Sequence, residues 1–103
     1  MPPSKYVTHE EIRKHFNGGG YFERTQTGEY LIKVTDVGPS RRVPGARSQT
    51  VRYLDQNGRT VAIVHQDGDE YGNPAEGRKP DPKYLFHNGI RYRPFAIDPN
   101  TQP

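Results

Sequence analysis

The strongest constraint on the fold is the stretch 49–66, in which two β-branched and aromatic runs flank Asn57 and Gly58. An Asn-Gly pair between such runs is typical of a two-residue β-hairpin turn. A turn centred on this pair fixes which residues of the two strands stand opposite each other. The expected pairs are Gln56 with Arg59, Leu54 with Val61, and Val51 with Val64.

This register sorts the side chains of the hairpin onto two faces, because successive residues of a strand point to opposite sides. One face is apolar and is expected to meet the core. The other mixes aliphatic residues with Arg52 and His65, a pattern expected of a ribbon covered on both sides. The predicted core face consists of Val51, Tyr53, Ala62 and Val64.

A short helix is predicted at the N-terminal side of the chain. Thr8 and Glu11 form a capping box, in which the two side chains bond to free amides of the first helical turn. Ile12 and Phe16 follow on one side of this helix and are expected to dock on a sheet. The glycines at 18–20 then end the helix.

Two more hairpins are expected. The alternating segments 21–25 and 29–37 predict one that turns near Gly28, and the segment 83–95 predicts another that turns at Asn88 and Gly89. Three hairpins in succession favour a meander. The predicted fold is therefore α+β, with a short N-terminal helix packed on an antiparallel β-meander of about six strands.

Composition indicates one small ordered domain over 1–103, with disordered tails at 1–5 and 98–103. Hydrophobic residues make up only 30% of the chain, but seven Tyr and four Phe supply large apolar area. The absence of Cys excludes disulfides, thiolate metal sites and cysteine nucleophiles. No secretion signal or membrane-spanning run is visible, so we expect a cytoplasmic protein with no membrane partner.

Two loops of opposite charge flank the central hairpin. The segment 38–47 is rich in Pro, Gly and Arg, which predicts an exposed basic loop, and the segment 67–82 opens with acidic residues. Arginine pairs well with carboxylates and phosphates, so both loops are candidate contact surfaces. The candidate residues are Arg41, Arg42, Arg47, Asp67, Asp69 and Glu70.

The third hairpin carries aromatic and arginine side chains on one face. Such a face allows bases to stack while guanidinium groups meet phosphates. The alternative is that these residues form an ordinary solvated strand surface. The face consists of Tyr84, Phe86, Arg91 and Arg93.

The histidines allow an enzymatic alternative. His65 and His87 lie on predicted strands, and if they converge near Arg91, a metal-independent ribonuclease with histidine as base becomes an option. A structural role for both imidazoles is the competing interpretation. No metal or cofactor site is expected, because the acidic run lacks the ladder of a calcium loop and the glycines lack a phosphate-loop Lys.

Residues 51–93 resemble a group of small uncharacterised bacterial proteins. The shared frame is a hairpin that ends in V-H-Q at 64–66, a Gly-rich loop, and P-D-P-K at 80–83 before a closing strand pair. In this chain the loop reads D-G-D-E-Y-G-N-P-A-E-G, where a shorter turn richer in Gly and Ser is expected. The resemblance implies bacterial or phage origin and brings no catalytic residues.

These observations predict a small non-enzymatic binding or regulatory protein. We expect an inhibitor or adaptor that occupies a surface of a protein or nucleoprotein partner and needs no cofactor. One alternative is the ribonuclease-type toxin that uses histidine and arginine. The other is direct binding of single-stranded nucleic acid through the Tyr/Arg sheet face.

Overall fold

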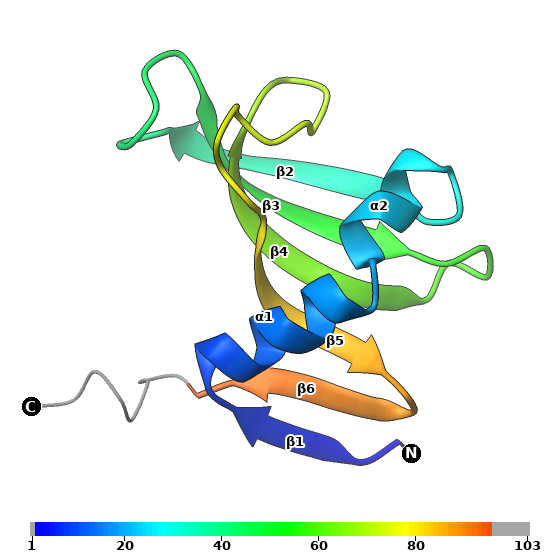
Figure 1. Cartoon of the computed structure of the whole chain (residues 1–103). Coiled ribbons are helices and arrows are strands. Elements are labelled where there is room, and N and C mark those ends of the chain that lie inside the picture. The colour runs from blue at the N-terminus through cyan, green and yellow to red at the C-terminus, as the bar shows by residue number, and fades with distance from the viewer. Residues whose placement is uncertain (1, 96–103) are drawn as a thin grey trace, which may run out of the picture.

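The computed structural model describes residues 2–95, which form one six-stranded sheet and two short helices (Figure 1). The strand order is β1-β6-β5-β4-β3-β2, so the five strands from β2 to β6 form an antiparallel meander. The α+β class is confirmed. The elements are β1 (Ser4–Val7), α1 (His9–Gly18), α2 (Tyr21–Gln26), β2 (Leu31–Pro39), β3 (Arg47–Leu54), β4 (Thr60–Gly68), β5 (Asp81–His87) and β6 (Ile90–Pro94).

The sixth strand is one that the sequence did not predict. Ser4 and Lys5, expected in a disordered tail, begin β1, which pairs in parallel with β6. The pairing satisfies backbone groups on the open edge of β6, and it brings Val7 into the core at 3% exposure. The expected tail at 98–103 lies outside the described residues.

Helix α1 packs as predicted, and one of the two hydrogen bonds of the predicted capping box forms. The Thr8 hydroxyl accepts a hydrogen bond from the Glu11 amide at 3.1 Å, which satisfies one of the unpaired amides of the first turn. Ile12 and Phe16 lie one turn apart and are both buried. The helix ends at Gly18 and is capped by Gly19.

The predicted strand at 21–25 is wrong, because these residues form helix α2. Gly20, the N-cap of α2, has φ +65° and changes the direction of the chain between the two helices. Tyr21 can then turn into the core, where its ring stacks on Phe16 and Tyr30. Burial of this one large side chain outweighs the alternation that favoured a strand, and β2 pairs with β3 instead.

The central hairpin of β3 and β4 forms, but its turn differs from the prediction. Of the two predicted turn residues, only Gly58 has a positive φ. The Asp55 carboxylate accepts hydrogen bonds from the amides of Asn57 and Arg59, both at 2.9 Å. The amide of Asp55 donates to the Arg59 carbonyl at 2.9 Å, so the loop between these two residues holds three residues rather than two. The expected pair of Gln56 with Arg59 is therefore wrong.

The longer loop shifts the residue pairs next to the turn, and a β-bulge restores the predicted pairing further along β3 and β4. Leu54 pairs with Thr60 rather than with Val61. Val61 is the extra residue of a bulge, after which Val51 stands opposite Val64 as predicted. The four predicted core residues of this hairpin are all buried.

The hairpin of β5 and β6 matches the prediction. His87 pairs with Ile90 and Leu85 pairs with Tyr92. Asn88 has φ 51° and Gly89 has φ 78°, so both central residues adopt the left-handed conformation of a two-residue hairpin turn.

The sheet has a covered face and an open face. Both helices lie on the covered face, where α1 packs against β5 and β6 (Figure 1). The expectation that the central ribbon is covered on both sides is therefore wrong for the described part of the chain. The covered face contains Val51, Tyr53, Ala62, Val64, Leu85 and Tyr92, and the open face contains Lys33, Arg52, Ile63, His65, Tyr84, Phe86, Arg91 and Arg93.

Within residues 2–95, no helix is long and apolar enough to span a membrane.

Candidate functional site

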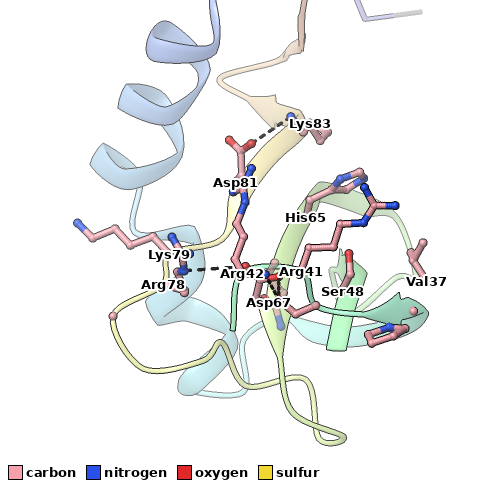
Figure 2. A pocket seen from close by; sticks show the side chains of 15 residues that line it. Val37, Arg41, Arg42, Ser48, His65, Asp67, Arg78, Lys79, Asp81 and Lys83 are labelled. Atoms are coloured by element: carbon pink, nitrogen blue, oxygen red, sulfur yellow. Dashed lines mark hydrogen bonds and ion pairs between the residues drawn. The ribbon is translucent and has the colours of Figure 1, made fainter. Parts of the chain in front are cut away.

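A cleft of about 830 Å³ opens at one end of the sheet, between the loop 40–46 and the segment 77–83 (Figure 2). Its floor is formed by the ends of β3 and β4, including Ser48 and His65 on the open face. Five cationic side chains and two carboxylates line it. These are Arg41, Arg42, Arg78, Lys79 and Lys83, with Asp67 and Asp81.

Ser40 shapes the basic loop and fixes it to β4. Its hydroxyl donates to a carboxylate oxygen of Asp67 at 2.7 Å and accepts from the amides of Arg42 and Val43. Its own amide donates to the carbonyl of Ala46 across the loop at 3.0 Å. This compact turn holds the two adjacent arginines at the rim of the cleft.

The opposite wall neutralises both carboxylates of the cleft. Arg78 places Nε 4.0 Å from Asp67, and Lys83 places Nζ 3.0 Å from Asp81. The second oxygen of Asp81 is buried and has no hydrogen-bond partner among the described residues. Both ion pairs are partly exposed and contribute little to stability, so their main effect is to cancel the negative charge of the cleft.

The remaining cations of the cleft have no internal anionic partner. Within residues 2–95, the side chains of Arg41, Arg42 and Lys79 make no hydrogen bond or ion pair, and all three are exposed. Arginine presents a fork of donors that matches two oxygens of a phosphate or carboxylate. The cleft is therefore an electropositive site with donors available for an anionic ligand.

The acidic loop does not join the site as a unit. Asp67 lines the cleft, but Asp69 accepts hydrogen bonds from the amides of Tyr71 and Asn73 in a tight turn, and Glu70 lies away from the cleft. The hydrogen bond from the Asn73 backbone is the main cause that lowers the pKa of Asp69. Asp69 thus stabilises the loop 69–80. Arg47, predicted in the basic loop, is instead the first residue of β3 and pairs with Asp36 at 3.7 Å.

The two candidate catalytic histidines lie on opposite faces of the sheet. His65 is exposed in the cleft and stands opposite Asp81 in the β4–β5 register. His87 lies six residues further along β5, about 20 Å away at the rise of a strand. Its ring packs against His15 on the covered face, with a centroid distance of 5.3 Å. The structure therefore does not bring His65 and His87 together.

His87 is held by a structural network. The hydroxyl of Tyr21 lies 2.9 Å from its Nδ1, and the same hydroxyl donates to the carbonyl of Phe86. Burial, followed by the nearby His15 and Arg24, lowers the pKa of His87, because each disfavours the charged imidazole. Among the described residues, no group of three or more His, Asp or Glu side chains is placed to hold a metal ion.

The Tyr/Arg face assembles on the open side of β5 and β6 as the sequence indicates. Phe86 stands opposite Arg91, and the guanidinium of Arg93 lies 5.0 Å from the centre of the Tyr84 ring. Arg91 is less available than its neighbours, because it donates to the carbonyl of Pro2 at 3.2 Å and is half-buried.

The sequence prediction missed the three cations of the second wall, Arg78, Lys79 and Lys83. They fall in R-K-P-D-P-K, which overlaps the P-D-P-K part of the resemblance. The β4–β5 register places His65, from V-H-Q, opposite Asp81, so the two segments that carry the resemblance meet in the cleft. The cluster of basic residues in this segment is visible in the sequence. That these residues line the same cleft as the loop 40–46 follows only from the order of the strands.

Comparison with known proteins finds a partial match. No protein-family model matches the chain, and no solved structure matches it significantly. The chain is 31% identical over 77 residues to a glutamyl-Q tRNA(Asp) synthetase of Cronobacter sakazakii. The matched region is 72% of this chain and 24% of that protein, so the chain spans about a quarter of this relative's length.

Proposed function

We propose that the protein is a non-enzymatic binding protein whose cleft holds phosphate groups of a nucleic acid or nucleoprotein partner. The observation that carries the proposal is the charge balance of the cleft. Its two carboxylates are already paired with Arg78 and Lys83, whereas Arg41, Arg42 and Lys79 have no anionic partner among the described residues. Phosphate oxygens complement such donors in charge and geometry.

The distribution of charge over the two sides of the sheet supports this proposal. The helices lie on the covered side, and their three acidic and three basic side chains cancel in formal charge. These are Glu10, Glu11 and Glu23, with Arg13, Lys14 and Arg24. The strand positions of the open face carry Lys33, Arg52 and Arg93. A polyanion is thus attracted more strongly to the open side than to the helices.

A binding role also agrees with the separation of the histidines. The ribonuclease alternative requires His65 and His87 to converge on the same substrate, but the two histidines face opposite sides of the sheet. A small bacterial or phage regulator that covers part of a nucleic acid or of its complex with protein needs no assembled catalytic set.

The proposal is tested by measuring the affinity for a fluorescent single strand of about 12 nucleotides, a length that such binding sites commonly span, as a function of salt. Transfer RNA is a suitable folded probe, because the partial match is to a protein named for tRNA. Each phosphate contact contributes about −0.7 to the salt slope for single strands. The R41A/R42A/K79A variant should therefore lower the slope by about 2 and weaken binding at low salt.

The matched control removes three exposed cations that lie outside the cleft, in the R13A/K14A/R59A variant. Arg13 and Lys14 are on α1, and Arg59 is in the β3–β4 turn at the other end of the sheet. Its affinity and salt slope should stay close to those of the original chain. Equal losses in both variants, or no binding at low salt, would overturn the proposal.

A further inference from the structure

We infer that the nucleic acid is single-stranded and that its bases stack on a row of side chains that crosses the open face. This inference rests on the proposed function and specifies its ligand. The row, called the transverse row below, consists of Lys33, Arg52, Ile63, Tyr84, Arg93 and Tyr6.

The sheet register places these residues side by side. Lys33 stands opposite Arg52, Arg52 opposite Ile63, and Ile63 opposite Tyr84. The guanidinium of Arg93 then lies over the Tyr84 ring, and Tyr6 is the β1 partner of Arg93. Six strands span five spacings, so the row is about 24 Å long.

The chemistry of the row fits a strand of unpaired nucleotides. Lys33, Arg52 and Arg93 form no ion pair within the described residues, and no carboxylate interrupts the row. Tyr6 is 61% exposed, and its ring stacks on that of Phe95 at 6.3 Å. Tyr84 and Tyr6 flank Arg93, and rings beside a cation allow bases to stack while the phosphates are neutralised.

The transverse row is continuous with the cleft. Ile63 in the row and His65 in the cleft are two residues apart on β4 and point to the same face, about 7 Å from each other. A strand whose phosphates enter the cleft can therefore lay its bases across the row. In a duplex the bases are stacked and paired with each other, so their flat faces are not available to Tyr6 and Tyr84.

The test compares binding of one sequence as a single strand and as a duplex, with changes in the two tyrosines. One stacked base is worth about tenfold in affinity. The Y6L/Y84L variant should lose about tenfold or more for the single strand and keep its duplex affinity, whereas Y6F/Y84F, which retains the rings, should bind as the original chain does. Y6L alone, at the exposed edge, should show part of the loss.

The control is Y71L, because Tyr71 is 73% exposed but lies in the loop 69–80, away from the row. It should leave both affinities unchanged. Equal affinity for single strand and duplex, together with unchanged binding by Y6L and Y6L/Y84L, would overturn the inference. If R41A/R42A/K79A still weakens binding in that case, the proposed function stands, whereas absence of all binding at low salt would remove both.

Discussion

The covered and open faces are built from alternating residues of the same strands, yet they differ in almost every physical property. On β5, Leu85 is fully buried under α1, while its neighbour Tyr84 is half-exposed on the open face beside Arg93. On β3, Tyr53 is buried and Arg52 is exposed. The difference shows that stability and ligand binding depend on separate side chains, although both depend on the same backbone.

The covered face itself changes character toward the cleft. Beyond Val51 and Val64 its next pair is Gln49 with Gln66, which are buried and hydrogen-bonded to each other at 3.1 Å. Gln49 also donates to Asp36 and to the carbonyl of Asp69, and Gln66 donates to the carbonyl of Gly72. These bonds attach the loop 69–80, which continues into one wall of the cleft, to the core.

The largest expected effect is the difference in stability between substitutions at two neighbouring residues of β5, one on each face. Leu85→Ala removes a fully buried side chain and should lower the free energy of unfolding by about 3 kcal/mol. Tyr84→Ala should cost about 1 kcal/mol, chiefly through its contact with Arg93. Urea unfolding followed by circular dichroism gives both values. Equal losses would mean that the open face is packed as tightly as the core.

A smaller effect is expected where the covered face becomes polar. Gln49→Leu keeps the volume but leaves the Asp36 carboxylate and the Asp69 carbonyl without their donor, at a cost of about 2 kcal/mol. Amide hydrogen exchange in the loop 69–80 should accelerate in this variant. The control is Gln56→Leu, because Gln56 is exposed in the β3–β4 turn. A neutral Gln49→Leu would show that these bonds do not hold the loop.

The smallest effect concerns the two histidines of the opposite faces. The pKa of His87 is lower in the folded state than in the unfolded chain. The neutral imidazole therefore stabilises the fold fully above the unfolded pKa of about 6.5, and this contribution is lost as the pH falls below that value. His87→Gln should reduce the loss of melting temperature on going from about pH 7 to about pH 5. His65→Gln, on the open face, serves as control and should keep the original pH dependence. The reverse ranking would contradict the assignment.

The two Asn-Gly pairs show how far local sequence determines local structure. Both predict a hairpin, and both hairpins form, but only Asn88 adopts a positive φ. The first turn differs because Asp55 precedes it, and its carboxylate caps the amides of Asn57 and Arg59 in a three-residue loop. The presence of the two hairpins was therefore predictable from the Asn-Gly pairs. The residue pairs next to the first turn were not, because they depend on the side chain of Asp55, which lies outside the Asn-Gly pair.

Other errors come from contacts between distant segments. A strand was predicted at 21–25, but these residues form a helix because Tyr21 reaches a core that contains Phe16 of α1 and Tyr30, the residue before β2. Likewise Arg41 and Arg42 are candidate contact residues from composition, but their placement with Lys79 in one cleft depends on the order of β3, β4 and β5. Residues far apart in the chain, rather than one motif, make the candidate site.

The most direct test of the central claim, that the open face and its cleft are the binding surface, is a nuclear magnetic resonance titration with a single-stranded oligonucleotide. Shifts in the amide signals should concentrate in the loop 40–46, the segment 77–83 and the strand residues of the transverse row, and should saturate together. Signals of α1 and α2 on the covered side should move little. Shifts confined to the helices, or no shifts at low salt, would contradict the account.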